Sequence, residues 1–202
     1  MRIIQEILGY CMFGVVGLAV LAIPCLPFCF LLRKRIPVIR QIVYFCFGVC
    51  IVVILGATVL IGIRSVAAAD RSLNLTPFRL FTEPWLMGEE KKVAQSLANI
   101  LMFVPPGFFL PVAFRKVRRL WKTTVCMMFF SFFIEFTQYF TGRSADIDDL
   151  ILNTTGGILG YLVFALFSRL FGGRKLWKGC LAQPEYLHGQ EGGHDEHKKK
   201  NY

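Results

Sequence analysis

Residues 131–160 read SFFIEFTQYFTGRSADIDDLILNTTGGILG, and this stretch decides how the whole chain is interpreted. It places Glu135 and Gln138 inside an apolar run, and a short loop with one Arg and three Asp follows. A second apolar run then opens with Asn153 and a group of small residues. Because an ionisable side chain is costly to expose to lipid, we expect these polar groups to face protein or water.

The composition of the chain is that of an integral membrane protein. Of the 202 residues, 55% are hydrophobic and only 18% are charged, whereas about a quarter are charged in an ordinary soluble domain. Uncharged apolar runs long enough to cross a bilayer recur along the sequence. The sequence therefore predicts an all-α fold, a polytopic bundle of about five transmembrane helices.

The five apolar runs are predicted to be the membrane spans. They cover about residues 7–32, 41–63, 97–114, 123–140 and 150–171. The first is too long for the apolar region of a signal peptide and lacks a small-residue cleavage site, so we expect a retained helix. The third contains Pro105-Pro106-Gly107, and tandem prolines predict a break in that helix. A broken helix often lines a site, although a kinked packing helix is as good an interpretation.

Basic residues gather in the loops 33–40 and 115–122 and at the end of the last apolar run. Cytoplasmic loops are enriched in Lys and Arg, so we expect these segments inside, the N-terminus outside and the C-terminus in the cytoplasm. This distribution explains the net charge of +10. No nucleic-acid partner is expected, because the sequence carries no RNA- or DNA-binding motif.

With this orientation, polar residues from three helices fall at one depth. Asn99 and Asn153 lie early in the third and fifth runs, which lead inward. Glu135 and Gln138 lie late in the fourth run, which leads outward. At about 1.5 Å per residue, all four lie in the outer part of the bilayer. The sequence therefore predicts an outward-facing polar site shared by three helices.

Glu135 is the candidate catalytic residue of this site, and the loop after it supplies further candidates. The predicted binding residues are Asn99, Glu135, Gln138, Arg143, Asp146, Asp148, Asp149 and Asn153. A structural alternative pairs Glu135 with Arg143 as a tie between two helix ends. The three Asp residues precede a helix, where carboxylates cap free N–H groups and oppose the helix dipole.

Asp146 and Asp148 are also candidate ligands of a divalent cation such as Mg²⁺ or Ca²⁺, because hard cations prefer carboxylate oxygens. The segment does not follow the EF-hand pattern, since Ile151 rather than Gly holds the sixth position counted from Asp146. No other cofactor is expected, and capping remains the alternative role for these carboxylates.

Several short motifs, in this order, resemble those of the VanZ-like membrane protein family. They are Asn74-Leu75-x-Pro77-Phe78, Asn99-x-x-x-Phe103-x-Pro105-x-Gly107, Ser131-x-x-x-Glu135-x-x-Gln138, Gly142-Arg143-Ser144-x-Asp146-x-Asp148-Asp149 and Asn153-x-x-Gly156. The resemblance covers about residues 74–171. One departure is Pro106, where the family pattern leads us to expect a large apolar residue.

Four segments are predicted on this basis. Residues 1–63 form two N-terminal transmembrane helices, and residues 64–96 form an extracellular loop. The VanZ-like domain with three transmembrane helices covers residues 74–171. Residues 179–202 are polar and mixed in charge, which indicates a disordered cytoplasmic tail.

The resemblance implies a multi-pass protein of the cell membrane with a role in resistance to teicoplanin, a lipid-tailed glycopeptide antibiotic. It carries no mechanism, so two main hypotheses stay open beside a third, a transporter, which the predicted break in the third apolar run favours but the lack of an evident internal repeat does not. One is a protein without enzymatic activity that lowers lipoglycopeptide action at the outer leaflet. The other is a membrane enzyme that acts on a lipid-linked cell-wall or phospholipid head-group substrate, with Glu135 as acid and base. The expected partner is a membrane lipid, a lipid-linked envelope component or the lipoglycopeptide.

Overall fold

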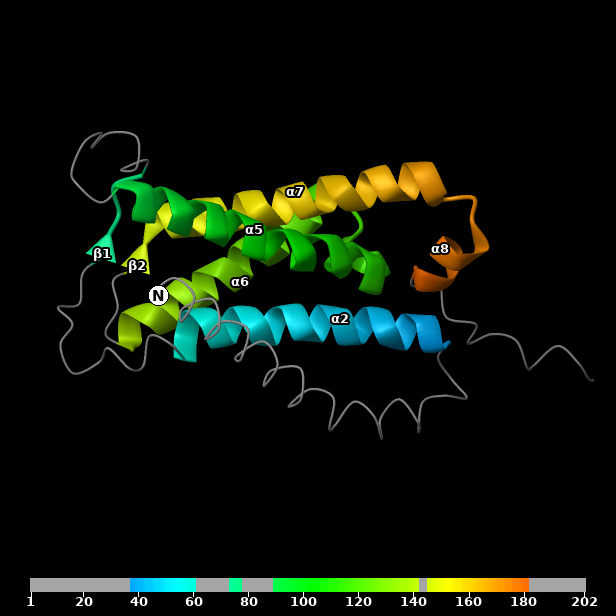
Figure 1. Cartoon of the computed structure of the whole chain (residues 1–202), viewed down its shortest axis with the longest axis horizontal. Helices are drawn as coiled ribbons and strands as arrows, with labels where there is room; N and C mark the ends of the chain where they lie inside the picture. Colours follow the sequence, from blue (N-terminus) through cyan, green and yellow to red (C-terminus); the bar gives the residue numbers. More distant parts are fainter. Residues whose placement is uncertain (1–36, 61–72, 78–88, 142–144, 182–202) are drawn as a thin grey trace, which may run out of the picture.

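The protein is an all-α bundle in a computed structural model that describes residues 37–60, 73–77, 89–141 and 145–181 (Figure 1). Its elements are α2 (Val38–Leu55), the π-helical turn η1 (Gly56–Leu60), β1 (Leu73–Asn74), α5 (Glu89–Ala113), the 3₁₀ turn η2 (Arg115–Val117), α6 (Leu120–Phe140), β2 (Ala145–Asp146), α7 (Ile147–Phe171) and α8 (Lys175–Cys180). The predicted fold class is confirmed for these residues.

Four helices in the described part are long and apolar enough to cross a membrane. These spans are Val38–Thr58, Gln95–Ala113, Leu120–Phe140 and Ile147–Phe171. They match the second to fifth predicted apolar runs. The first predicted run, residues 7–32, lies outside the described residues, as do residues 182–202 of the predicted tail. The start of that tail, at about Gly179, falls inside α8.

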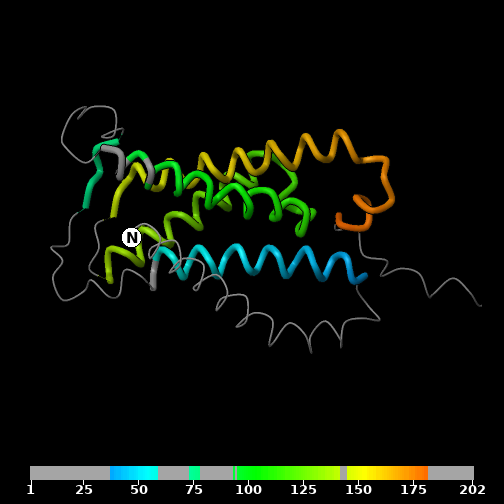
Figure 2. The backbone as a smooth tube through the Cα atoms, in the orientation of Figure 1, coloured from blue at the N-terminus to red at the C-terminus, as the bar shows by residue number. Residues whose placement is uncertain are grey.

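The long helices lie side by side along the long axis of the molecule, with α8 at one end and the two short strands at the other (Figures 1 and 2). The most extensive packing joins α5 to α7, while α6 packs on α7 and α2 packs on α5. α5 is therefore the central helix, with α2 and α7 both in contact with it.

Glycines bring α5 and α7 into backbone contact. A Cβ atom added to Gly156 would overlap the carbonyl oxygen of Ile100, and one added to Gly160 would overlap that of Val104. A Cβ on Gly107 of α5 would likewise overlap the backbone of α7. Small residues allow such close approach of membrane helices, where dispersion contacts replace the hydrophobic effect.

The predicted break in the third apolar run is wrong. α5 is helical from Glu89 to Ala113, with Pro105, Pro106 and Pro111 inside it. Each proline removes only its own backbone donor, and membrane helices tolerate this loss where neighbouring helices support the segment. The support here is α7, which meets α5 at Gly107, directly after the tandem prolines.

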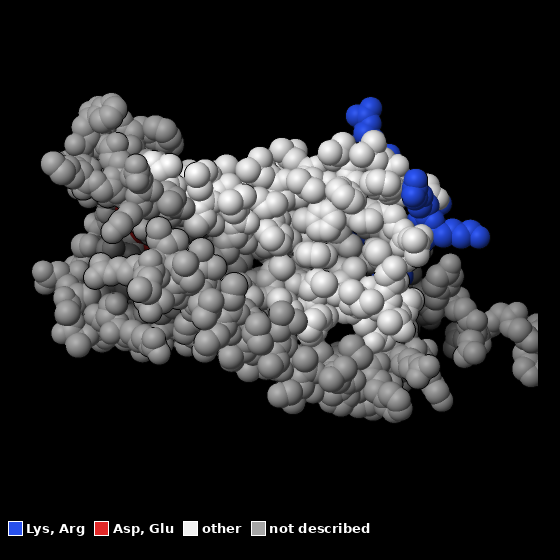
Figure 3. Space-filling view, viewed as in Figure 1, with Lys and Arg blue, Asp and Glu red and all other residues white. Residues whose placement is uncertain are grey.

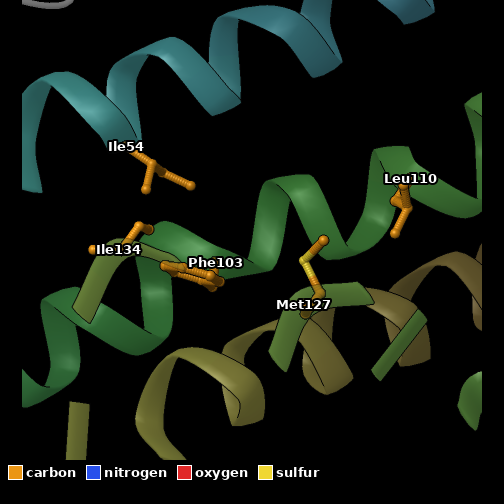
Figure 4. Close-up of a cluster of buried hydrophobic side chains, with 5 residues drawn as sticks. All are labelled: Ile54, Phe103, Leu110, Met127 and Ile134. Carbon is orange, nitrogen blue, oxygen red and sulfur yellow. The ribbon is translucent and has the colours of Figure 1, made fainter. Parts of the chain in front are cut away.

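Two apolar clusters fill the bundle. The first consists of Ile54, Phe103, Leu110, Met127 and Ile134, which α2, α5 and α6 direct toward one another (Figure 4). The second lies toward α8 and consists of Val43, Val112, Ala113 and Phe164. Trp177 of α8 packs against the second cluster, so the short last helix is held to the bundle.

Among the described residues, acidic side chains lie at one end of the bundle and basic side chains gather at the other. We call the end that carries β1, β2 and the first turns of α5 and α7 the polar end, and every Asp and Glu among the described residues lies there. The opposite end, the basic end, carries Arg40, residues 115–122 and residues 169–178. Figure 3 shows Lys and Arg side chains gathered at this basic end.

Candidate functional site

At the polar end, Asp146 links the beginning of α7 to β1. It is the N-cap of α7, and its Oδ1 accepts a hydrogen bond of 2.9 Å from the backbone N–H of Asp148. Its Oδ2 accepts a second bond, of 3.0 Å, from the side-chain amide of Asn74. The predicted capping role is therefore confirmed for Asp146. The same carboxylate also fixes the strand β1 to the beginning of α7.

The pairing of β1 with β2 is a second link between these segments. β1 and β2 pair in parallel, with Leu73 opposite Ala145 and Asn74 opposite Asp146. The pair joins the long connection between η1 and α5 to the loop that precedes α7. Segments far apart in the sequence are thus brought together over the end of α6.

The side chain of Glu135, on α6, also contacts Asp146. Its side chain is only 7% exposed, and its Oε2 accepts a hydrogen bond of 3.1 Å from the backbone N–H of Asp146. The expectation that this carboxylate faces protein rather than lipid agrees with that burial. Arg143, the predicted ion-pair partner, lies outside the described residues, so that pairing stays a prediction.

Two amides tie the neighbouring helices to α7. Asn99 of α5 donates to Oδ1 of Asp149 at 2.6 Å, in the first turn of α7. One turn deeper, Asn153 donates to the hydroxyl of Ser131 on α6 at 3.0 Å, and both of these residues are buried. Within the described chain, the amide oxygen of Asn153 is buried without a hydrogen-bond partner. The predicted convergence of polar residues from three helices at one end is what the structure contains.

Gln138 connects α6 to the end of α2. Its side-chain amide donates to the backbone carbonyl of Thr58 at 3.1 Å, and Thr58 lies in the π-helical turn η1. The hydroxyl of Thr58 donates to the carbonyl of Ile54 at 2.7 Å. Sequence reasoning missed Thr58, because a backbone carbonyl that accepts a bond leaves no residue-type signature.

A pocket of about 370 Å³ opens between β1, β2 and α6. Its lining residues are Leu73, Asn74, Leu75, Phe132, Glu135, Phe136, Tyr139, Phe140, Ala145, Asp146, Ile147 and Leu150. The wall is largely apolar, and Asn74, Glu135 and Asp146 contribute polar groups to it. This combination, an apolar hollow with a few convergent polar groups, is typical of small-molecule sites.

The aromatic side of the pocket is a ladder along α6. Phe132 and Phe136 have ring centroids 6.2 Å apart, and Phe136 and Phe140 have centroids 4.7 Å apart. These residues are one helical turn apart, so they share one face of the helix. More than half of each side chain is exposed. The ladder and the buried Glu135 therefore line the same pocket, which opens on the outer surface of the bundle.

The predicted site residues divide into two groups. Glu135 and Asp146 line the pocket, whereas Asn99, Gln138, Asp148, Asp149 and Asn153 do not. Asn99 and Asp149 join α5 to α7, Asn153 joins α7 to α6, and Gln138 joins α6 to η1. These contacts hold together the helices around the pocket. Asn74 was recognised in a family motif but not predicted as a site residue, because its partner Asp146 lies far away in the sequence.

The chemistry that the pocket offers is limited. Among the described residues that line it there is no Ser, Cys, His or Lys, and the ionisable side chains there are Glu135, Tyr139 and Asp146. Nor do the described residues contain a group of three His, Cys, Asp or Glu that could hold a metal ion. Both carboxylate oxygens of Asp146 already accept hydrogen bonds. A divalent cation at Asp146 and Asp148 stays a prediction.

Comparison with known proteins places the fold and the site in context. The family described as VanZ/LLP1 matches residues 41–168, so the match begins in α2, before the predicted start at residue 74. Protein VanZ of Enterococcus faecium is 32% identical over 108 residues, which cover 53% of this chain and 61% of that protein. The chain thus spans less than two thirds of the length of that relative. No solved structure matches the chain.

Proposed function

The chain belongs to the VanZ/LLP1 family, and from this premise we propose that it lowers the susceptibility of the cell to lipoglycopeptide antibiotics such as teicoplanin. The similarity to Protein VanZ of Enterococcus faecium supports the proposal. The pocket at the polar end is the part of the chain that would engage the antibiotic.

The observation that carries this proposal is the combination of an aromatic ladder and a carboxylate in one pocket. A volume of about 370 Å³ is near the lower limit for small-molecule sites, which is suited to a hydrocarbon chain and too small for a whole glycopeptide. The fatty-acyl tail would therefore enter along Phe132, Phe136 and Phe140. The polar part of the ligand would remain outside, near Asn74 and Asp146.

The distribution of charge supports an outer position for the pocket. The basic end carries the Lys and Arg that are expected in the cytoplasm, and the pocket lies at the opposite end. A lipoglycopeptide inserts its tail from outside the cell. The proposed site would therefore meet the tail in the leaflet that the antibiotic reaches first.

The proposal is tested by expressing the chain in a susceptible strain and measuring the minimal inhibitory concentrations of two glycopeptides, one with and one without a lipid tail. We expect expression to raise the value for the tailed compound alone. Equal protection against both compounds would contradict tail recognition, and no protection against either would contradict the proposed function.

A membrane enzyme that acts on a lipid-linked head group is the second candidate function. The observation in its favour is that Glu135 is buried and lines the pocket, because burial tunes a carboxyl group for proton transfer. Glu135→Gln keeps an oxygen that accepts from the N–H of Asp146 but cannot exchange a proton. Full loss of protection with normal folding would favour the enzyme, whereas retained protection would exclude Glu135 as its acid or base.

A further inference from the structure

The pocket at the polar end has a second apolar wall, formed by β1 rather than by a helix. Leu73 and Leu75 line the pocket together with the phenylalanines of α6. The side chain of Leu73 is 58% exposed and that of Leu75 is 64% exposed. An exposed apolar surface beside polar neighbours marks a place where a ligand or the membrane makes contact.

Hydrogen bonds of Asn74 fix the position of this wall. Its side-chain amide donates to Oδ2 of Asp146 at 3.0 Å, and its Oδ1 accepts from the backbone N–H of Thr76 at 3.2 Å. The strand pair sets Leu73 opposite Ala145 in β2. One end of the amide thus attaches β1 to the N-cap of α7, and the other end holds the residues that follow the strand. Asn74 therefore determines where the two leucines lie.

The dimensions and the chemistry of the pocket favour a hydrocarbon chain. Phe132 and Phe140 are the two ends of the aromatic ladder, about 12 Å apart along the axis of α6 at about 1.5 Å per residue. The hydrocarbon layer of one leaflet is about 15 Å deep. Since α6 is apolar and long enough to cross a membrane, the ladder would run parallel to the lipid chains over most of that depth. The described lining residues include no Lys or Arg that could bind an anionic group instead.

We propose that Leu73 and Leu75 hold a single fatty-acyl chain against the phenylalanines of α6, and that Asn74 is the positioning residue of this acyl-chain site. The inference rests on the proposed function, because it identifies further residues that would contact the tail of a lipoglycopeptide. It also gives a role to Asn74 and Leu75, which begin the first of the sequence motifs.

The test uses the full chain in phosphatidylcholine vesicles, with a lysophosphatidylcholine whose acyl chain carries a photoreactive diazirine. Mass spectrometry of the irradiated protein locates the label. We expect label on residues 73–77 and on residues 132–140, because both segments line the pocket. An excess of unlabelled lysophosphatidylcholine should remove this label, since a site can be saturated whereas general exposure to lipid cannot.

Two leucine variants separate the site from the rest of the apolar surface. Leu75→Ala should lower the label on residues 132–140 about fivefold, because dispersion contacts with the chain are lost. Leu97→Ala is the matched control, since Leu97 is similarly exposed, on α5, but does not line the pocket. Its label should stay at the wild-type level. Thermal unfolding checks that both variants fold, and substitutions at such exposed positions should change stability little.

The role of Asn74 has a readout of its own. Asn74→Ala keeps both leucines but removes the hydrogen bond to Asp146. The label on residues 73–77 should therefore fall by a larger factor than the label on residues 132–140. An unchanged ratio between the two segments would contradict positioning by Asn74.

Two further outcomes would overturn the acyl-chain site. One is label that excess lysophosphatidylcholine does not reduce, and the other is equal label in Leu75→Ala and Leu97→Ala. Competition separates this inference from the proposed function, because teicoplanin should displace the label and a glycopeptide without a lipid tail should not. Saturable, Leu75-dependent label that teicoplanin leaves in place would support the acyl-chain site and contradict the proposed function. Protection of cells without saturable label would contradict the site alone.

Discussion

The carboxylate of Glu135 accepts a hydrogen bond from the backbone N–H of Asp146, with Oε2 and N 3.1 Å apart. This bond joins the buried face of α6 to the residue that caps α7 and pairs with β1. The carboxylate therefore has a structural role as well as a position in the pocket. Substitutions that separate these two roles are the most informative.

Glu135→Ala should destabilise the protein by about 1–3 kcal/mol, because the N–H of Asp146 loses its acceptor in a partly buried site. Glu135→Gln should lower the stability by a smaller amount, since its amide oxygen still accepts a hydrogen bond from the N–H of Asp146. Thermal unfolding of the purified chain in detergent measures both variants. The same loss of stability in both would show that the hydrogen bond to Asp146 contributes little.

Asn99→Asp should destabilise the join between α5 and α7, because it places a carboxylate against Asp149 at a site where the wild-type atoms are 2.6 Å apart. The expected loss is about 1–3 kcal/mol. The exchanged pair, Asn99→Asp with Asp149→Asn, should recover much of the stability. Purely additive effects of the two substitutions in thermal unfolding would contradict the contact.

Gly160→Ala should destabilise the bundle by about 1–3 kcal/mol, the usual cost of overpacking, because the new Cβ overlaps the carbonyl oxygen of Val104. Gly48→Ala in α2 is the matched control, since no atom lies within 4 Å of its Cβ position. A helical Gly-to-Ala change with open space should be neutral or stabilising. Similar unfolding temperatures for the two variants would disprove close packing of α5 on α7.

Much of this site could be predicted from the sequence, because it follows from periodicity and helix direction. Glu135 and Gln138 share a face of one helix, and alternating helix directions place Asn99 and Asn153 at the same end. The contacts of Thr58 and Asn74 could not be predicted, since they depend on a backbone carbonyl and on a strand pair between distant segments. The break at Pro105 was predicted wrongly, because support from α7 is a tertiary effect.

Single-cysteine labelling should establish the orientation of the bundle. In a background without the native cysteines, Thr76→Cys at the polar end should react with a membrane-impermeant maleimide added to intact cells. Lys175→Cys at the basic end should react only after permeabilisation, because basic segments are retained in the cytoplasm. The reverse pattern would place the pocket in the inner leaflet and exclude direct contact with an external antibiotic.

Recognition of the lipid tail of a glycopeptide by the aromatic pocket can be tested with two Phe residues of α6. Phe136 lines the pocket between Phe132 and Phe140, whereas Phe129 is also exposed on α6 but does not line it. The two alanine variants therefore remove the same side chain inside and outside the site.

The decisive measurement is the minimal inhibitory concentration of teicoplanin for cells that express wild-type chain, Phe136→Ala or Phe129→Ala at equal membrane levels. We predict that Phe136→Ala removes most of the protection and that Phe129→Ala retains it. Equal protection by both variants at the wild-type level would contradict recognition of the tail in this pocket.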